Sequence, residues 1–188
     1  MAVRTFLALD IDRSIQDRLA EFQQKLAACE AKGRLVAPEN LHVTLHFLGD
    51  VADEMTAEVC EMVEAVAGQL DPFDFEVKGI RCVPPGGRPR MIWAGVDDPA
   101  GQMASLHEAL GEALGGLGVR REERGFKPHL TLIRFKLVRN VTQVHSLAAE
   151  HAETLFGTRH AGEVCVYSSQ LTPRGPVYSR MAAPPLGR

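Results

Sequence analysis

The sequence repeats one pattern, His-apolar-Thr-Leu, first as His42-Val43-Thr44-Leu45 and again as His129-Leu130-Thr131-Leu132. One copy of so short a pattern is weak, because a strand histidine beside a threonine is usually a hydrogen-bonded structural pair. The chain has only seven histidines, so a second copy is a signal. Each copy stands in a short apolar run preceded by a proline, which is typical of a β-strand. We therefore expect the fold to be arranged around these two strands.

Side chains on a β-strand alternate between its two faces, so each copy places an imidazole beside a hydroxyl. His42 and Thr44 share one face of the first strand. His129 and Thr131 share one face of the second, and the apolar residues between them point towards a core. If the two strands face each other across a cleft, two histidines and two threonines line it.

That arrangement suits the cleavage of a phosphodiester bond. One imidazole removes a proton from the attacking oxygen, and the other protonates the leaving oxygen on the opposite side of phosphorus. Imidazole can serve in either role near neutral pH because its reference pKa is about 6.5. The threonine hydroxyls would donate hydrogen bonds to the non-bridging oxygens, which carry the developing charge. The scheme requires no cofactor and no metal.

Composition limits the class of protein. The 188 residues are 45% apolar, which suffices for one domain over residues 1–188, built of two small lobes. A net charge of -3 argues against a protein that coats long nucleic acid, although a local basic site for one or two phosphates stays open. The four cysteines form no Cys-x-x-Cys pair, so neither a zinc module nor a disulfide framework is indicated.

Targeting signals are not evident in the sequence. No apolar run approaches the roughly 18 to 20 residues of a membrane span. The N-terminus lacks the charged, apolar and small-residue order of a signal peptide. We therefore expect a cytoplasmic protein with no membrane partner. We also expect a monomer, although no sequence feature bears on the oligomeric state.

Hydrophobic periodicity and turn residues divide the chain into two comparable sets of elements, each with one His-x-Thr-Leu strand. A pseudo-symmetric α+β protein with two lobes is the economical interpretation, because it lets the motif strands face each other across a cleft. The tail at 183–188 is expected to be loose. Strands are predicted at 3–11, 41–49, 73–78, 91–96, 129–135, 163–171 and 177–181, and helices at 15–29, 53–70, 99–114 and 141–156.

At these residues the sequence resembles the 2H phosphoesterases, which are defined by paired His-x-Thr-Leu motifs. Within them it is similar to the RNA 2',3'-cyclic phosphodiesterase family, formerly called 2'-5' RNA ligases. The resemblance covers nearly the whole chain, with one departure at Leu35, where many relatives have a tryptophan that is a candidate for stacking on a base. The segments that carry it are Arg4–Asp10, Pro38–Gly49, Pro89–Val96, Phe126–Arg134 and Ser168–Tyr178.

The resemblance implies a bilobal fold with a pseudo-twofold axis, in which two antiparallel sheets line a central cleft and helices lie outside. It implies metal-independent hydrolysis of a terminal 2',3'-cyclic phosphate, on RNA or on a cyclic nucleotide, to a 2'-phosphomonoester. A weak reverse activity would join RNA ends through a 2'-5' bond. By motif position, His42 is the proton donor to the leaving 3'-oxygen and His129 is the base that activates water.

The resemblance also implies substrate-binding residues. Thr44 and Thr131 would hold phosphate oxygens, and Phe6 would border the nucleoside. Arg134, five residues after the second histidine, would also contact phosphate. Strict strand alternation puts Arg134 on the face opposite His129, so this role requires a β-bulge or a strand end.

Other residues near the motifs have structural interpretations. His46 shares the face of His42, but a solvated strand histidine is the expected state. Trp93 is expected to pack in the core rather than to serve as a stacking platform. We assign no role to His107, His145, His151 or His160, which lie on predicted helix surfaces or at an element edge.

Two basic segments could guide an RNA backbone, Arg88 with Arg90 and Arg120 with Arg121 and Arg124, although charged loops are more often simply solvated. The alternative function, from another class, is a nucleotide- or RNA-end-binding module with little turnover. Release of a 2'-phosphate from a cyclic-phosphate-ended oligonucleotide separates the enzyme from the binder.

Overall fold

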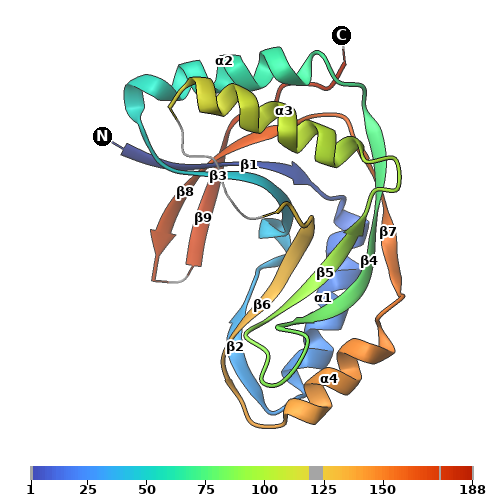
Figure 1. The fold of residues 1–188 in the computed structure, drawn as a ribbon. Coiled ribbons are helices and arrows are strands. Elements are labelled where there is room, and N and C mark those ends of the chain that lie inside the picture. Colours follow the sequence, from blue (N-terminus) through green and yellow to red (C-terminus); the bar gives the residue numbers. More distant parts are fainter. Residues whose placement is uncertain (1, 119–124, 174, 188) are drawn as a thin grey trace.

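The computed structural model describes residues 2–118, 125–173 and 175–187 (Figure 1). The described residues form strands, α-helices and short 3-10 helices that alternate along the chain. The strands are β1 (Ala2–Asp10), β2 (Ala31–Leu35), β3 (His42–Ala52), β4 (Phe73–Val83), β5 (Met91–Asp97), β6 (His129–Val138), β7 (Leu155–Ala161), β8 (Cys165–Thr172) and β9 (Gly175–Ala182). The helices are α1 (Arg13–Ala27), α2 (Thr56–Ala67), α3 (Gln102–Gly116) and α4 (Val141–Glu150), with 3-10 turns at Pro38–Asn40 and Asp53–Met55.

The strands pair into two antiparallel sheets. One sheet has the order β3-β1-β8-β9 and the other the order β2-β6-β5-β4-β7, so each contains one motif strand. Strands β3 and β6 approach each other where the sheets meet. The predicted α+β architecture with two antiparallel sheets is confirmed.

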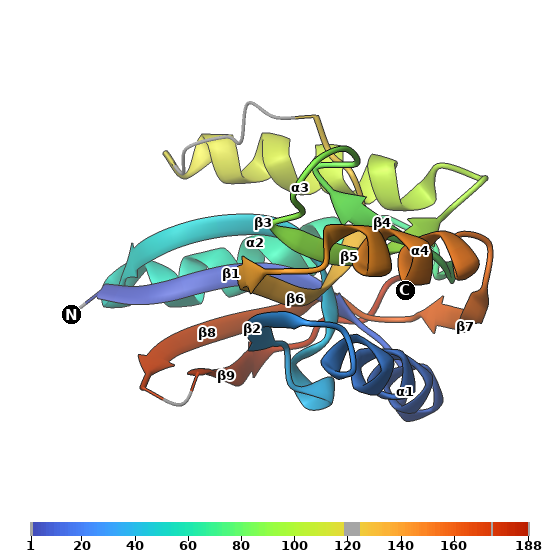
Figure 2. The same ribbon diagram turned by 90° about the horizontal axis from the view of Figure 1, so that it is seen from below.

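Helices cover the outer sides of the sheets. Helix α1 packs on β2, β6 and β7, and α4 packs on β4, so both cover the five-stranded sheet. Helix α3 packs on β3 and on α2, and the two helices run side by side over the four-stranded sheet (Figure 1). Seen from below, α3 and α1 lie on opposite sides of the molecule with the strands between them (Figure 2). No helix in the described ranges is long and apolar enough to cross a membrane.

The chain passes back and forth between the sheets. Helix α1 follows β1 of the four-stranded sheet but packs on the five-stranded one, and α3 follows β5 but packs on β3. Strands β8 and β9, at the C-terminal end, complete the sheet that β1 began. The two lobes are therefore interleaved rather than formed by consecutive halves of the chain.

The sequence analysis did not predict two of the strands, β2 and β7. Strand β2 has the sequence Ala-Lys-Gly-Arg-Leu and four exposed residues, so it shows no hydrophobic period; it forms because its backbone pairs with β6. The helix predicted over 141–156 ends at Glu150, and residues 155–161 instead form β7 along β4. In both cases long-range backbone pairing, which leaves no local period, decides the structure.

The expectation of a loose tail at 183–188 is wrong for its described part. Leu186 is 4% exposed and belongs to the core. Its backbone N–H donates to the Gly162 carbonyl at 2.9 Å, and the Gly187 N–H donates to Ala67 at 3.2 Å. The tail therefore fastens the end of α2 to the turn before β8.

Strands β3 and β6 repeat the same order of buried and exposed residues from their first histidine. In β3 the pairing with β1 skips Leu45, and in β6 the pairing with β5 skips Leu132. Each β-bulge lies three residues after the motif histidine and inserts one extra residue. The bulge reverses the alternation beyond it, so the fifth residue after each histidine returns to the histidine's face.

Candidate active site

His42 and His129 are the first residues of β3 and β6, and both rings are held in the same way. Nδ1 of His42 lies 2.8 Å from the Asn40 carbonyl oxygen, and Nδ1 of His129 lies 2.7 Å from that of Lys127. A carbonyl oxygen only accepts hydrogen bonds, so Nδ1 donates in each ring. In both neutral imidazoles, Nε2 is then the nitrogen that can exchange a proton with a substrate.

An aromatic ring backs each histidine. Phe6 stacks on His42 with ring centroids 4.9 Å apart, and Trp93 stacks on His129 at 3.7 Å with an interplanar angle of 20°. The expectation that Trp93 only packs in the core is therefore wrong. Trp93 lies opposite Thr131 in the β5–β6 pair, so its ring shares the face of the motif.

The two histidines lie within electrostatic reach of each other. Burial lowers the pKa of His42, and the charge of His129 adds to that effect. The carbonyl of Asn40 and the negative charge of Asp10 act in the opposite direction on the same pKa. Asp10 is directly opposite His42 in the β1–β3 pair, which explains its influence.

His129 has different surroundings. Burial has the largest influence on the pKa of His129 and lowers it. The Lys127 carbonyl raises this pKa, and the positive charge of Arg134 lowers it. A carboxylate thus favours the protonated form of His42, whereas a guanidinium favours the neutral form of His129. Paired groups whose surroundings differ in this way are suited to acid and base roles.

The bulge at Leu132 resolves the geometric question about Arg134. Arg134 lies opposite Met91, two residues along β5 from Trp93, and therefore on the face of His129 and Thr131. Its guanidinium donates to the Met91 sulfur at 2.9 Å and remains exposed. The β-bulge that its predicted role required is present.

Phe47 occupies the corresponding position in β3 and was missed by the sequence prediction. It is five residues after His42, as Arg134 is after His129, and its side chain is 60% exposed. Its ring lies 6.1 Å from that of Phe6, which is only 4% exposed. The equal spacing after each histidine is the signal that could have identified it.

A cavity of about 330 Å³ opens beside His42. Thr44 and Thr131 are partly exposed on the same faces as their histidines. Tyr178 contacts the His42 ring and the Phe6 ring that backs it, with its centroid 4.9 Å from that of Phe6 and 5.5 Å from that of His42. The residues that line the cavity are Asp10, Glu39, Asn40, Leu41, His42, Tyr167, Tyr178 and Arg180.

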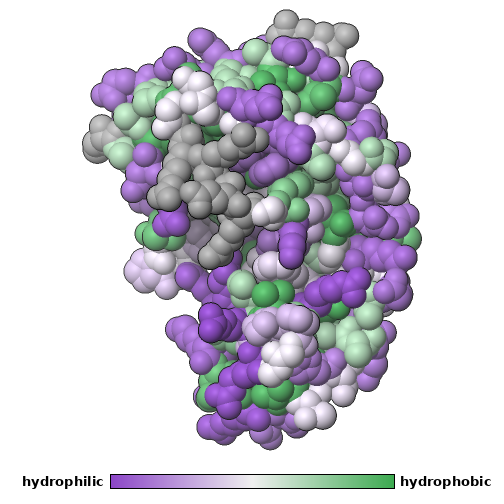
Figure 3. Space-filling view, in the orientation of Figure 1, coloured by the Kyte–Doolittle hydropathy of each residue, from purple (hydrophilic) through white to green (hydrophobic). Residues whose placement is uncertain are grey.

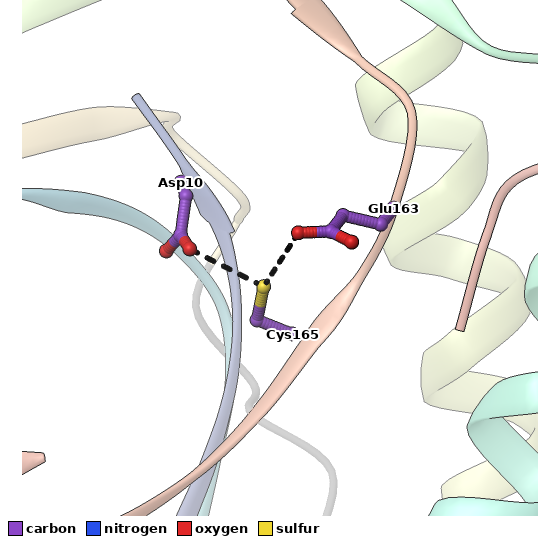
Figure 4. A group of neighbouring side chains, drawn as sticks. All are labelled: Asp10, Glu163 and Cys165. Atoms are coloured by element: carbon purple, nitrogen blue, oxygen red, sulfur yellow. Dashed lines mark hydrogen bonds between the residues drawn. The ribbon is translucent and has the colours of Figure 1, made fainter. Parts of the chain in front are cut away.

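Asp10 is fixed by a network of polar side chains. Tyr167 donates its hydroxyl to both carboxylate oxygens at 2.9 Å, and Arg180 donates to one of them at 2.9 Å. Arg180 also pairs with Glu163 at 3.0 Å. Figure 4 shows both carboxylates directed at the Cys165 thiol from opposite sides.

The donor atoms of Asp10, Glu163 and Cys165 lie within 4.8 Å of one another, a spacing that a metal ion could use. The Arg180 guanidinium, however, already bridges the two carboxylates. Burial, followed by the charge of Asp10, raises the pKa of Cys165 to about 12, so this group is a thiol rather than a thiolate ligand. We interpret the cluster as an ion-pair network that orients Asp10 towards His42.

His46 and His107 differ from their expected states. His46 is 5% exposed, not solvated, and its ring stacks on that of His107 at 4.1 Å. His107 in turn stacks on Phe126 at 4.1 Å, and its Nδ1 bonds to the Leu45 carbonyl at 2.9 Å. The stack connects α3 to the bulge of β3 and to the segment that leads to His129.

The structure describes only one of the two basic segments. Arg88 and Arg90 are exposed in the loop between β4 and β5, and their part in guiding RNA stays a prediction. Arg120, Arg121 and Arg124 lie outside the described residues. On the face drawn in Figure 3, apolar side chains are scattered among polar ones.

The sequence model of a known family matches the chain twice. The family is described as LigT-like phosphoesterase, and the matched stretches are 9–93 and 95–178, so each contains one motif histidine. The chain belongs to the LigT-like phosphoesterase family. The resemblance stated from the twin motifs is confirmed.

Individual relatives agree with the family. The chain is 34% identical to an RNA 2',3'-cyclic phosphodiesterase of Methanothermobacter thermautotrophicus over 96% of this chain and 97% of that protein. It is 35% identical to an RNA 2',3'-cyclic phosphodiesterase of Archaeoglobus fulgidus over 94% of this chain and 96% of that protein. Among solved structures, a Thermus thermophilus protein matches with a TM-score of 0.82 and 26% identity over 97% of both chains. Escherichia coli LigT complexed with 3'-AMP matches with a TM-score of 0.78 and 25% identity over the whole of both chains.

Proposed function

We propose that the protein is an RNA 2',3'-cyclic phosphodiesterase, which hydrolyses a terminal 2',3'-cyclic phosphate to a 2'-phosphomonoester. The observation that carries the proposal is the pair formed by His42 and His129, each with Nδ1 held by a backbone carbonyl and Nε2 left for substrate. The names of the two archaeal relatives and the nucleotide in the LigT complex support the same substrate class.

The two histidines divide the reaction between them. Nε2 of His129 accepts a proton from water as the water oxygen bonds to phosphorus. The bond from phosphorus to the 3'-oxygen breaks, and Nε2–H of His42 donates its proton to that oxygen. The product carries a 2'-phosphate and a free 3'-hydroxyl. Asp10 favours the protonated acid and Arg134 favours the neutral base, in agreement with these roles.

The remaining site residues bind the substrate in this proposal. Thr44, Thr131 and Arg134 donate hydrogen bonds to the phosphate oxygens, whose charge grows in the transition state. Phe6 is only 4% exposed, so its main role in this proposal is to support the His42 ring at the edge of the nucleoside site. Phe47, 60% exposed on the face of His42, offers the larger surface for the nucleoside.

Replacement of each histidine tests the proposal. Removing a general acid or base costs about 10²- to 10⁴-fold in rate, so His42→Ala and His129→Ala should each lose at least a hundredfold in hydrolysis of a 2',3'-cyclic nucleotide. His145→Ala is the matched control, because it changes a partly exposed histidine of α4 whose Nε2 bonds to the loop carbonyl of Gly87 at 2.8 Å. Circular dichroism verifies that the variants fold.

The product and the effect of a chelator distinguish the alternatives. The proposal expects a 2'-phosphate product, full activity in EDTA, and loss of activity in both histidine variants. Affinity for a cyclic-phosphate-ended oligonucleotide without any 2'-phosphate product would instead identify a binding module. Loss of activity in EDTA would identify a metal-dependent phosphoesterase.

The protein would act on RNA with 2',3'-cyclic phosphate ends or on cyclic nucleotides. We further propose that residues 1–188 act as one domain, as a cytoplasmic monomer, and that Arg88 and Arg90 contribute to RNA approach. Gel filtration of the purified protein tests the monomer directly.

A further inference from the structure

Two arginines stand directly opposite each other beside the active site. Arg34 of β2 and Arg134 of β6 are cross-strand partners, and opposite residues of an antiparallel pair point to the same face. Arg34 therefore shares the face of Arg134, His129 and Thr131. Like charges directly opposite each other destabilise a sheet. Among the described residues, neither guanidinium forms an ion pair with a carboxylate that would offset this repulsion.

Arg34 extends from one sheet to the other. A Cβ added at Gly175, the first residue of β9, would lie 3.0 Å from a terminal nitrogen of the Arg34 guanidinium. A glycine at this position leaves the space that the guanidinium uses. The charge of Arg34 is thus held where the five-stranded sheet meets the β8–β9 hairpin.

A third arginine joins the group from β1. Burial raises the pKa of Tyr178, and the positive charges of Arg134, Arg4 and Arg34 lower it, so all three guanidinium groups act on one phenol. Arg4 lies opposite Asp50 in the β1–β3 pair but forms no ion pair with it within the described residues. The Tyr178 hydroxyl has no hydrogen-bond partner in the described part of the chain and can donate to an anion.

We propose that Arg4, Arg34 and Tyr178, together with Arg134, form a second phosphate site, which binds the phosphodiester joining the terminal nucleotide of an RNA to the preceding one. This inference rests on the proposed function. Arg134 shares the face of His129 on β6, and Arg34 lies directly opposite Arg134 on β2. The second site therefore adjoins the place of the cyclic phosphate. The nearest other anion on an RNA end is that phosphodiester. A cyclic mononucleotide lacks it, so the site selects polynucleotide ends.

Comparison of two substrates tests the site. The substrates are cytidine 2',3'-cyclic phosphate and a cytidine dinucleotide with a 2',3'-cyclic phosphate end, which differ by one nucleotide and its phosphodiester. In Arg34→Gln, the ratio of kcat/KM for the dinucleotide to kcat/KM for the mononucleotide should fall about tenfold, through KM, as expected for one charge-assisted contact. Tyr178→Phe, which keeps the ring beside His42, should lower the same ratio.

Arg13→Gln is the matched control, because it removes an equal charge from α1, where Arg13 pairs with Asp17 at 2.9 Å. The control should leave the ratio at the wild-type value. An unchanged ratio in Arg34→Gln, or an equal loss on both substrates, would overturn the second site. If the wild-type protein hydrolyses neither substrate, the proposed function fails. In that case, the affinity of the wild-type protein and of Arg34→Gln for the non-cyclic dinucleotide 2'-phosphate tests the second site separately. Weaker binding by Arg34→Gln would support the site, and equal binding would overturn it.

Discussion

Asp10 and Arg134 give two otherwise equivalent histidines unequal surroundings. Each of the rings of His42 and His129 has Nδ1 bonded to a backbone carbonyl and an aromatic ring stacked on it, and burial lowers the pKa of both. What separates them is one carboxylate and one guanidinium contributed by neighbouring positions. The assignment of acid and base therefore depends on single residues outside the motif.

Asp10→Asn should move the pH optimum of hydrolysis to lower pH. The charge of Asp10 raises the pKa of His42, so its removal lowers that pKa and leaves less protonated acid at alkaline pH. Activity should fall above the optimum and stay near the wild-type value well below it. A pH profile of kcat/KM measures the shift. Asp74→Asn removes an equal charge at an exposed ion pair with His160, and a shift of the same size there would contradict the role of Asp10.

Two β-bulges determine what β3 and β6 present to the cleft. Without them, alternation would place Phe47 and Arg134 on the side opposite the histidines. With them, each motif strand presents three side chains on one face, an imidazole, a hydroxyl, and then an aromatic ring in β3 or a guanidinium in β6. The bulges thus extend each motif by one functional position.

The C-terminal tail contributes to the core through Leu186. Leu186→Ala should destabilise the protein by about 2–5 kcal/mol, because it leaves a cavity in the core. Leu171→Ala, the same substitution at a side chain that is 67% exposed, should change the free energy of unfolding by less than about 0.5 kcal/mol. Denaturant unfolding of both variants measures the difference. Similar values for the two leucines would show that the tail does not pack as described.

At the scale of the whole molecule, the interleaved chain places His42 and His129 where the two sheets meet. Each sheet contributes one histidine, and the four-stranded sheet combines β1 and β3 with β8 and β9 from the C-terminal end of the sequence. A site between two sheets is partly closed to water, which is why burial is the largest influence on the pKa of each histidine. Active-site geometry and overall stability are consequently linked through protonation.

The protein should lose stability on acidification below about pH 6.5, the reference pKa of histidine in an unfolded chain. The folded-state pKa values of His42 and His129 are lowered, so the unfolded state binds protons first as the pH falls. This loss ends once the pH is below the folded-state values. Thermal unfolding from about pH 7.5 to about pH 5 measures the effect, and a His42→Gln, His129→Gln double variant should show a shallower decline. An equal decline in the double variant would assign the effect to other groups.

The sequence by itself determined the motif strands, the pair of histidines that we propose as acid and base, and the α+β class, because a repeated pattern on an alternating strand carries its own geometry. It also determined most helices, whose buried residues recur at helical spacing. Only the tertiary structure decided the roles of Trp93, Phe47 and Asp10, the strands β2 and β7, and the packed tail. Each of these depends on a partner far away in the chain. A bulge, a stacked ring or an edge strand leaves no period in the local sequence, and its place is set by the strand it pairs with.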